Sequence, residues 1–570
     1  MKTIFRYLKP YQSKLFLGIL IKAVAGILDL MLPFLLAVII DRIIPTKSIP
    51  LVLWFGVMML VAAILSLTFN VLANRISAKV STDAILDLRK DGYRKIMALP
   101  SKRVDEVGLP SLVSRMTTDT YHVYRFFNVM QRMGIRAPIL LIGAVILMVI
   151  IDFNLSIIML VMLPLLFMVV GFITVKGIPY FDTLQRSLDE LIKVVRENLT
   201  GIRIIKAFNQ QDNEIKRFSN INELTSMKEQ KANIIVGLLN PTMALLLNSG
   251  LIIILWVGAN NVLNGTSNVG SIIAYISYFT LILNAFYALN RIFLLSSKAS
   301  ASANRLTELL ESDDHVSIIP SDKDSSDNRV LSFEHVTFGY FDQEPTLKDI
   351  HFDLYPHETL AIIGATGSGK STLAQLCLRL YDPQSGTISL LGQNIQSIPL
   401  SELRKSFAVV FQNDTLFSFT IAQNIQLGDV VSDELMITSL NQAQADFVQE
   451  LPLKLETSVQ RSGSNFSGGQ KQRLVLSRAF AKEAKVLILD DASSALDYMT
   501  ESLIFQNLKS MKPLSTLLIT QRVSLALAAD KVLMLEAGKM VGYGTHSELM
   551  KTCIPYKQLV NIQLGGEAYE

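Results

Sequence analysis

The sequence predicts a membrane domain of six helices followed by a soluble α/β domain. Half of the 570 residues are hydrophobic and only 18% are charged, which is below the roughly 25% usual for soluble domains. The apolar runs that predict the helices all lie before residue 296, and each approaches the length needed to cross a bilayer. After them, short β-rich runs alternate with helical stretches, as in α/β domains. The chain is also too long for one hydrophobic core, so at least two domains are expected.

Six apolar runs, taken in chain order, predict the membrane helices. A spanning helix needs roughly 20 residues. The runs cover Leu15 to Ile40, Leu51 to Leu72, Ala137 to Ile151, Leu155 to Val175, Ile234 to Val257 and Ile272 to Leu295. The third run is short, so we expect it to use apolar residues from Phe126 onward. Before the first run, Met1 to Leu15 mixes basic and apolar residues, which predicts a short basic amphipathic helix on the membrane surface.

The links between these runs alternate in length and charge. The links after the first, third and fifth runs are short, and Gly258 to Asn268 contains no lysine or arginine. The links after the second and fourth runs are long, rich in lysine and arginine, and helical in their spacing of apolar residues. Because positive charge is retained on the cytoplasmic side, the termini and both long links are predicted to be cytoplasmic. We therefore expect a multi-pass protein of the cytoplasmic membrane.

The composition changes after the last run. Ser312 to Asn328 is polar and rich in Ser and Asp, as linkers are. We expect a membrane domain at 1–312, a linker at 313–329 and a second, cytoplasmic domain at 330–570. A largely parallel sheet in the second domain is predicted by the runs Val330 to Phe333, Thr359 to Ile363 and Lys485 to Leu489.

The net charge and the cysteines limit which functional classes the protein can belong to. The net charge of +4 is small for this length and gives no argument for a nucleic-acid partner. Cys377 and Cys553 lie far apart, without the spacing of metal ligands. We expect two free buried thiols in a reducing compartment.

A glycine-rich segment fits the pattern of a phosphate-binding loop. It reads Gly-Ala-Thr-Gly-Ser-Gly-Lys-Ser over Gly364 to Ser371, with a predicted strand before it and a helix after it. Glycines allow backbone N–H groups to surround phosphates at a helix N-terminus, which an ordinary glycine-rich turn, the alternative, does not require. Lys370 is expected to reach the outer phosphates, and the Ser371 hydroxyl to bind Mg²⁺. The candidate nucleotide contacts are Gly364, Ala365, Thr366, Gly367, Ser368, Gly369, Lys370, Ser371 and Thr372.

A carboxylate for the same site is predicted further along the chain. Val486 to Leu489 is an apolar, strand-like run that ends at Asp490. An aspartate at the end of such a strand organises Mg²⁺ in phosphate-loop folds. Taken alone, Asp490 could equally cap a helix, but the phosphate loop upstream favours the metal role.

The segment Asn465-Phe-Ser-Gly-Gly-Gln-Lys-Gln-Arg473 resembles the signature motif of ATP-binding cassette (ABC) proteins. In that family each ATP lies between the phosphate loop of one chain and the signature of another. The resemblance implies that Tyr340 stacks on adenine, that Gln412 binds Mg²⁺ and contacts the membrane domain, and that Ser493 to Asp497 crosses the dimer interface. The signature contacts to ATP would come from Ser467, Gly468, Gly469 and Gln470.

The membrane half resembles the exporter class of the same family. Glu197 to Phe208, which reads Glu-Asn-Leu-Thr-Gly-Ile-Arg-Ile-Ile-Lys-Ala-Phe, is similar to its second cytoplasmic loop. The resemblance implies a six-helix transmembrane domain, domain-swapped in a dimer, followed by an α/β phosphate-loop nucleotide-binding domain. It implies coupling helices near Leu109 to Asp119 and near Asn209 to Lys216. It also implies a transport-coupled ATPase that uses ATP and Mg²⁺, with a second half-transporter, the lipid bilayer and a small hydrophobic substrate as partners.

Three positions depart from the family pattern. The residue after the strand-end aspartate is normally a glutamate that polarises the attacking water, but here it is Asp491. The missing methylene draws the carboxylate back by about 1.5 Å, and a displacement of about 1 Å can cost roughly a hundredfold in rate. Gln521 replaces the switch histidine and cannot carry positive charge. Arg461 stands where the family often has a glutamate.

Asp491 and Gln521 are therefore the candidate catalytic residues of a weakened site. A weak phosphate-loop site beside a complete signature resembles the degenerate-site subunit of a bacterial heterodimeric multidrug exporter. A homodimer with slow, aspartate-assisted hydrolysis is the alternative.

Polar groups in the membrane runs bear on the substrate. Lys22 and Asp29 lie seven residues apart, so on one helix face, and charges at such depth usually face a cavity or a partner. The last run carries Tyr275, Tyr278, Phe279, Asn284, Phe286, Tyr287 and Asn290. These side chains suit a cavity for bulky amphipathic drugs, although plain helix packing explains any one of them as well. A lipid or lipid-linked flippase, an importer of metal chelates and a non-transporting ATP-dependent regulator or sensor stay open as alternatives.

Overall fold

The computed structural model describes residues 1–312, 318–320, 328–342, 344–511 and 514–565. These form two compact units, one of Met1–Met97 with Leu109–Ser312, and one of Ala98–Gly108 with the chain from Asp313 onward. The first is the predicted helical membrane unit and the second is an α/β unit. Most of the predicted linker at 313–329 lies outside the described residues.

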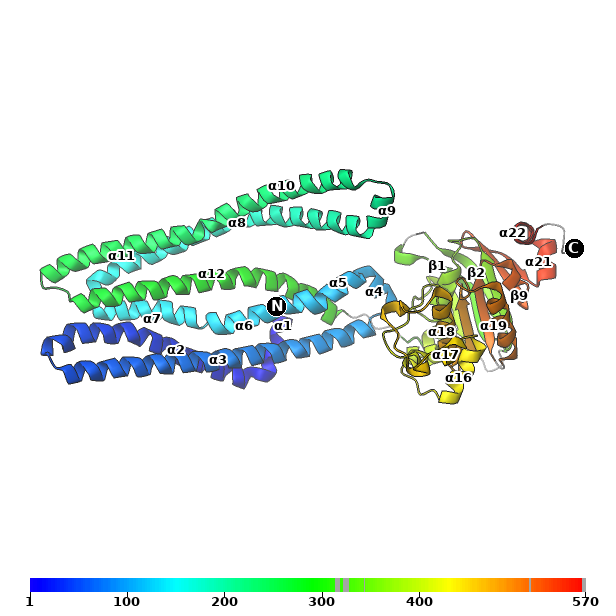
Figure 1. Cartoon of the computed structure of the whole chain (residues 1–570), viewed down its shortest axis with the longest axis horizontal. Helices are drawn as coiled ribbons and strands as arrows, with labels where there is room; N and C mark the ends of the chain where they lie inside the picture. Colours follow the sequence, from blue (N-terminus) through cyan, green and yellow to red (C-terminus); the bar gives the residue numbers. More distant parts are fainter. Residues whose placement is uncertain (313–317, 321–327, 343, 512–513, 566–570) are drawn as a thin grey trace. The chain divides into compact units, whose positions relative to one another are not determined.

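Six helical stretches in the described chain are long and apolar enough to cross a membrane. They run roughly side by side along the first unit (Figure 1). Each overlaps one predicted run, so the six-helix membrane domain is confirmed. The stretches are Lys2–Thr46, Ile49–Ala98, Leu109–Ile151, Phe153–Thr200, Pro241–Leu263 and Val269–Glu311.

The helices of this unit continue well beyond the apolar runs. The longest, α3 (Ile49–Ala98), extends far past the end of its run at Leu72. The short third run is extended by α6, as expected, with a break at Gly134 and Ile135 between the two helices. The remaining helices are α2 (Gln12–Val38), α5 (Leu109–Ser114), α6 (Thr120–Met133), α7 (Arg136–Ile151), α8 (Phe153–Thr200), α9 (Ile202–Ala207), α10 (Gln211–Gly237), α11 (Leu239–Leu263) and α12 (Val269–Glu311).

The N-terminal segment forms two short helical pieces that pack on the membrane unit. It forms α1 (Lys2–Phe5) and the 3₁₀ turn η1 (Arg6–Tyr11). Ile4 is fully buried in a cluster with Leu88 of α3 and Phe127 of α6. The hydroxyl of Tyr11 donates a hydrogen bond to Asp87, with 2.8 Å between the oxygens. The segment is therefore helical, as predicted, with one side packed against neighbouring helices. Its position on the membrane surface stays a prediction.

The second unit is built on one mixed sheet in the order β5-β4-β1-β2-β10-β9-β3-β8-β7-β6. The neighbours from β9 through β3, β8 and β7 to β6 pair in parallel, whereas β1 pairs antiparallel with both β2 and β4. The expected parallel sheet therefore forms only one part of it. The strands are β1 (Leu331–Phe338), β2 (Leu347–Leu354), β3 (Thr359–Gly364), β4 (Ser385–Leu390), β5 (Gln393–Asn394), β6 (Phe407–Val410), β7 (Val486–Asp490), β8 (Ser515–Thr520), β9 (Lys531–Glu536) and β10 (Lys539–Gly544).

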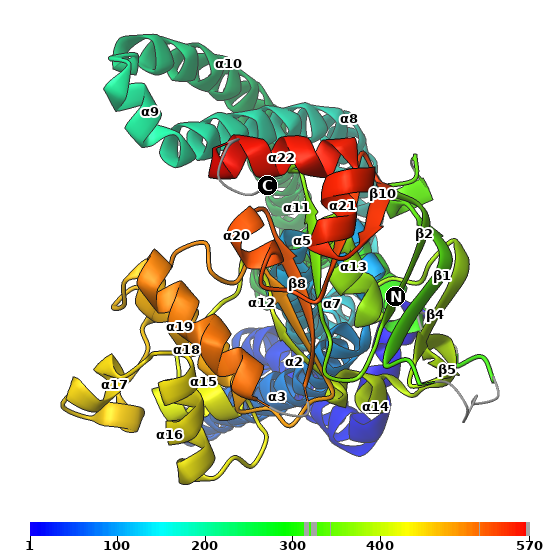
Figure 2. The same cartoon turned by 90° about the vertical axis from the view of Figure 1, so that its right-hand side faces the viewer.

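In the described residues, helices pack on this sheet around three hydrophobic clusters. Figure 2 shows α15, α16, α17, α18 and α19 gathered to one side, away from β1, β2 and β4. Both cysteines are free and buried, as predicted. The helices are α4 (Ser101–Val107), α13 (Lys370–Cys377), α14 (Leu400–Lys405), α15 (Ile421–Gln426), α16 (Asp433–Gln442), α17 (Phe447–Glu450), α18 (Gly468–Phe480), α19 (Tyr498–Ser510), α20 (Val523–Ala526), α21 (His546–Thr552) and α22 (Ile554–Leu564).

Candidate nucleotide-binding and membrane sites

The predicted phosphate loop connects β3 to the N-terminus of α13. Gly369 has a backbone φ of +98°, a conformation that residues with a side chain rarely adopt. A Cβ on Gly364 would lie 2.2 Å from the carbonyl oxygen of Leu535. Glycine is thus required at both positions, and the loop brings backbone N–H groups to the positive end of a helix.

Lys370 is held by the loop itself. Its ammonium donates to the carbonyls of Gly364 and Ala365 at 2.9 and 2.8 Å. An ammonium has three donors, so one is left for a phosphate oxygen. Burial lowers the pKa of Lys370, while the nearby carboxylates of Asp490 and Asp491 act in the opposite direction. A bound phosphate would supply the negative charge that favours the protonated ammonium.

The predicted Mg²⁺ ligands meet at the end of β7. The Ser371 hydroxyl donates to the Asp490 carboxylate at 3.0 Å. Asp490 is buried, and this burial raises the pKa of its carboxyl. Both residues line a cavity of about 220 Å³ together with Gln412. Hydroxyl, carboxylate and amide oxygens are the ligands that Mg²⁺ prefers. The hydroxyl of Ser368 is buried without a hydrogen-bond partner, so the loop also has an unused polar group for a ligand.

Asp491 and Gln521 line the same cavity. Asp491 has φ +49°, and its N–H donates to the carbonyl of Ile519 at 2.9 Å. The amide oxygen of Gln521 accepts from the Thr366 hydroxyl at 3.4 Å. The structure therefore brings both candidate catalytic residues to the phosphate loop, where their roles remain predictions.

Tyr340 lies beside the cavity without lining it. Its hydroxyl donates to the amide oxygen of Gln375 at 2.8 Å and accepts from the Thr372 hydroxyl at 3.2 Å, so the phenol is tied to α13. Its ring meets the ring of Tyr381 edge-on, with 5.1 Å between centroids. Adenine stacking on Tyr340 stays a prediction.

The signature residues lie at the N-terminus of α18. Ser467 caps this helix, accepting from the N–H of Gln470 at 3.3 Å, and the Gln470 side chain accepts from the N–H of Ser467 at 3.0 Å. Ser467 and Gly468 are exposed. None of the four predicted signature contacts lines the phosphate-loop cavity as the structure describes it. A helix N-terminus left open in this way suits an anionic ligand brought by another chain.

Two glutamines near these elements were not predicted. Gln472 of α18 accepts from the N–H of Ala495 at 2.8 Å and donates to the carbonyl of Asp491 at 3.4 Å. Gln563 of α22 donates to the carbonyl of Gln521. Gln472 lies in the signature segment, which could have drawn attention to it, whereas nothing in the sequence around Gln563 signals its contact.

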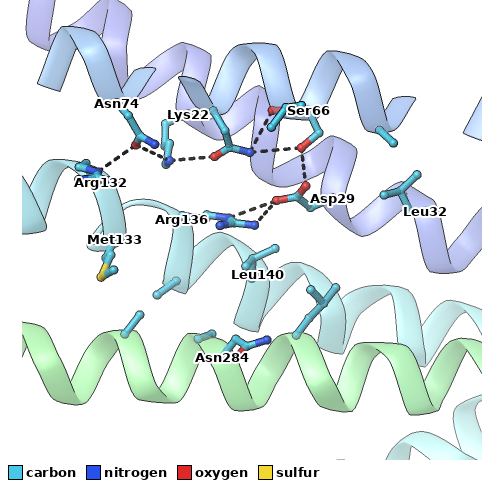
Figure 3. A pocket seen from close by; sticks show the side chains of 17 residues that line it. Lys22, Asp29, Leu32, Ser66, Asn74, Arg132, Met133, Arg136, Leu140 and Asn284 are labelled. Atoms are coloured by element: carbon cyan, nitrogen blue, oxygen red, sulfur yellow. Dashed lines mark hydrogen bonds and ion pairs between the residues drawn. The ribbon is translucent and has the colours of Figure 1, made fainter. Parts of the chain in front are cut away.

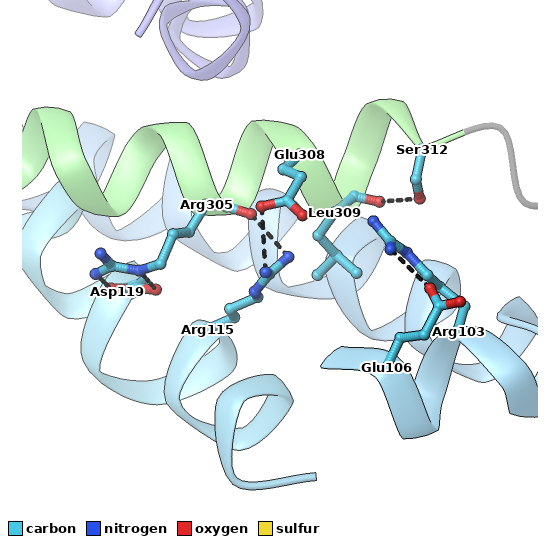
Figure 4. Close-up of polar contacts among 8 residues, drawn as sticks. All are labelled: Arg103, Glu106, Arg115, Asp119, Arg305, Glu308, Leu309 and Ser312. Carbon is cyan, nitrogen blue, oxygen red and sulfur yellow. Dashed lines mark hydrogen bonds and ion pairs between the residues drawn. The ribbon is translucent and has the colours of Figure 1, made fainter. Parts of the chain in front are cut away.

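The first predicted coupling helix is displaced in the structure. The segment grouped with the α/β unit contains α4, where the Tyr381 hydroxyl donates to Asp105. The predicted segment, Leu109 to Asp119, instead belongs to the membrane unit. There Arg115 pairs with Glu308 at 3.3 Å, and Arg305 pairs with Asp119 (Figure 4). The prediction was about ten residues too late, because these ion pairs hold the later segment on α12.

The second predicted coupling segment, Asn209 to Lys216, leads into the start of α10, and its docking on a cassette stays a prediction. A short helix, α9, joins α8 to α10 at their tip (Figure 1), just before the predicted Asn209 to Lys216. Ile204 in this helix and Phe208 directly after it are 65% and 73% exposed. The apolar side chains at this tip are therefore available for a partner.

The membrane unit contains a second cavity, of about 640 Å³, lined by Lys22, Asp29 and Asn284 among others. The aromatic side chains expected in a cavity lie elsewhere. Tyr275 and Tyr278 are fully buried, with hydroxyls that donate to the carbonyls of Met148 and Leu30. These tyrosines therefore pack between helices, which was the alternative interpretation, and do not line the cavity. Their buried hydroxyls are hydrogen-bonded to main-chain carbonyls.

Both parts of the chain match families of known proteins. Residues 15–286 match the ABC transporter transmembrane region, and residues 347–494 match the ABC transporter ATP-binding family. An uncharacterized ABC transporter ATP-binding protein of Bacillus subtilis is 33% identical over all of both chains. A multidrug resistance ABC transporter ATP-binding and permease protein of Lactococcus lactis is 32% identical, over 84% of this chain and 82% of the relative. The fold matches an ATP-bound bacterial Atm1-family ABC exporter with a TM-score of 0.82 and 23% identity, over 98% and 99% of the two chains.

Proposed function

Because the chain belongs to the ABC transporter family, with both its membrane and its ATP-binding domain, we propose that it is the degenerate-site subunit of a heterodimeric exporter. The chain is an ABC half-transporter with an exporter fold, and its cassette is a transport-coupled ATPase domain. Its proposed cargo is hydrophobic or amphipathic compounds. Its proposed domain limits are 1–312, 313–329 and 330–570, with α4 docked on the cassette.

The single observation that carries the proposal is the composition of the phosphate-loop cavity. Asp491 and Gln521 line it, in place of the family's glutamate and histidine. Binding of ATP needs the backbone N–H groups, Lys370 and the Ser371–Asp490 pair, all of which are intact. Hydrolysis additionally needs a base that reaches water and a donor that stabilises developing charge. The site is therefore suited to hold ATP and poorly suited to hydrolyse it.

Each of these side chains in the cavity has a defined role in the proposed function. Lys370 neutralises the outer phosphates, and Ser371, Gln412 and Asp490 hold Mg²⁺. When bound, Mg²⁺ neutralises charge on the phosphate oxygens and orients them. Asp491 has the chemistry of a base but the shorter side chain, and Gln521 can donate only a neutral hydrogen bond.

The signature supplies the other half of the proposal. Ser467, Gly468 and Gly469 are complete, and the α18 N-terminus is open within the chain. A partner that supplies glutamate and histidine would place its own ATP against this helix end. Turnover would then depend on this chain's signature and on the partner's phosphate loop.

Covalent trapping of nucleotide tests the proposal directly. The assembled pair is incubated with azido-ATP that carries the label on the γ-phosphate, and is then photo-crosslinked. We expect the label to persist on this chain and to disappear from the partner, because only the partner's ATP is cleaved. Lys370→Ala should remove the label from this chain, while the partner still cleaves its own ATP. Equal loss of label from both chains would contradict the degenerate site.

A further inference from the structure

The membrane-unit cavity has one polar wall and one apolar wall. It is bordered by α2, α3, α7 and α12, together with the end of α6. Figure 3 shows the polar wall as a continuous chain of contacts that runs from Arg132 through Asn74 to Lys22, and from Lys22 through Asn70 and Ser66 to Asp29 and Arg136. Leu32, Leu140 and Leu281 are among the residues of the apolar wall. A cavity of this kind matches a molecule with a polar head and an apolar body.

The polar wall carries an excess of positive charge. Lys22, Arg132 and Arg136 line it, against the single carboxylate of Asp29, which gives a net charge of +2. Asp29 pairs with Arg136, with 2.6 Å between the charged atoms. Within the described part of the chain, no carboxylate forms an ion pair with Lys22 or Arg132. Two cations of this wall therefore lack a counter-charge.

The contacts of these two cations leave hydrogen-bond donors for a ligand. Lys22 is buried and donates to the amide oxygens of Asn70 and Asn74 at 2.8 and 3.0 Å. Its ammonium has three donors, so one is unused. Arg132 donates through Nε to Asn74 at 3.2 Å. Its two terminal nitrogens have no hydrogen-bond partner among the described residues, and a guanidinium fork matches phosphate and carboxylate geometry.

The depth of the cavity indicates the source of the ligand. Lys22 precedes the turn at Thr46 by about 24 residues, which is roughly 35 Å along a helix that rises 1.5 Å per residue. The hydrocarbon core of a bilayer is about 30 Å thick. Because that turn is predicted to be extracellular, Lys22 lies on the cytoplasmic side of the bilayer, near the start of the apolar run from Leu15 to Ile40. Arg132 lies at the same level, because Arg132 and Lys22 both donate hydrogen bonds to the side chain of Asn74.

Uncompensated charges in a membrane protein are costly unless they face water or a partner. We propose that this cavity binds an amphiphile with an anionic head, phosphate or carboxylate, taken from the cytoplasmic leaflet. Lys22 and Arg132 hold the head, and the leucines contact the apolar body. The inference narrows the cargo of the exporter proposed above and rests on that function. It favours acidic amphiphiles, lipids included, over cationic drugs.

Ligand binding to the cavity can be measured without ATP hydrolysis. The result therefore does not depend on whether the phosphate-loop site is degenerate. The full-length chain is placed in phosphatidylcholine nanodiscs, and radiolabelled decyl phosphate is bound with and without competitors. We expect saturable binding that decyl maltoside and decyltrimethylammonium do not displace. A large excess of inorganic phosphate should also fail to displace it, because it lacks the apolar body. Equal displacement by inorganic phosphate, or by decyltrimethylammonium, would overturn the proposal.

Variants assign the binding to the two cations. Arg132→Gln should weaken binding by about tenfold, the effect of losing one charged hydrogen bond, and Lys22→Met together with Arg132→Gln by more. Arg132→Lys should retain most of the affinity, because it keeps the charge. Lys176→Gln is the matched control, since Lys176 is an exposed cation of α8 outside the cavity. Retained nucleotide binding verifies folding of each variant, and wild-type affinity in the double variant would refute the proposal.

Discussion

The side-chain amide of Gln563 donates a hydrogen bond to the main-chain carbonyl of Gln521, with 2.8 Å between nitrogen and oxygen. Its amide oxygen also accepts from the N–H of Val523 at 2.9 Å. One side chain of α22 therefore holds the backbone on both sides of Arg522. The position of Gln521 in the phosphate-loop cavity thus depends on the C-terminal helix as well as on β8.

Replacing Gln563 with alanine should loosen this loop. Each hydrogen bond contributes about 1 kcal/mol, so we expect hydrogen exchange at the Val523 amide to rise by tenfold or more. ATP affinity should fall severalfold, because Gln521 is less well placed. Asn561→Ala, an exposed change on the same helix, is the matched control and should alter neither quantity. Unchanged exchange at Val523 in Gln563→Ala would show that the contact does not position the loop.

The signature and the phosphate loop of this chain should contribute differently to turnover. Ser467→Ala or a bulky replacement of Gly468 should remove most of the ATPase activity of the assembled pair, because in the proposed pair these groups would face the partner's competent ATP. Lys370→Ala should weaken nucleotide binding at the degenerate site and reduce turnover less. The measurement is steady-state ATPase of the pair with each variant in this chain. Equal losses would show that the roles of the two elements are assigned wrongly.

Mg²⁺-dependent nucleotide binding should weaken in acid. Burial raises the pKa of Asp490 above its ordinary value, so protonation begins at a higher pH than for an exposed aspartate. The protonated carboxyl is a poor Mg²⁺ ligand, and affinity should therefore fall as the pH drops through the raised pKa. The check is nucleotide binding across pH with Mg²⁺ and with a chelator. The acid loss should vanish with the chelator and in Asp490→Asn, and an identical loss in that variant would exclude Asp490 as its cause.

The sequence predicted those features that depend on short contiguous segments. The glycines from Gly364 to Gly369 and the strand ending at Asp490 are each encoded within a few residues, so their local structures could be predicted. The six membrane helices followed from hydrophobic length alone. Asp491 and Gln521 could be placed in one cavity because both follow strands that neighbour each other in a parallel sheet.

Features that depend on distant contacts could not be predicted. The packing of Ile4 on α3, the hydrogen bonds of Tyr275 and Tyr278, and the clamp by Gln563 each join segments far apart in the sequence. The first coupling segment was misplaced because its position was taken from the family resemblance alone. The ion pairs of Arg115 and Asp119 with α12, which hold Leu109 to Asp119 in the membrane unit, join segments far apart in the sequence.

In the proposed heterodimer, ATP bound at the degenerate site would have a role even without hydrolysis. Nucleotide held between two cassettes favours the closed arrangement, and so shifts the equilibrium between inward-facing and outward-facing states. The bound ATP then acts as an effector coupled to the competent site. Asp491→Asn should consequently change turnover of the pair only modestly, because little chemistry depends on this carboxylate.

The most direct test of the degenerate site compares the ATPase activity of this chain alone with that of the co-expressed pair. Asp491→Asn is made in this chain, and the partner's corresponding glutamate is replaced by glutamine. We predict slow or no hydrolysis by the lone chain, robust hydrolysis by the pair, a modest effect of Asp491→Asn and loss of turnover with the partner's change. Robust hydrolysis by the lone chain that is lost on Asp491→Asn would contradict the account, and would show instead a homodimeric exporter in which Asp491 is a working catalytic base.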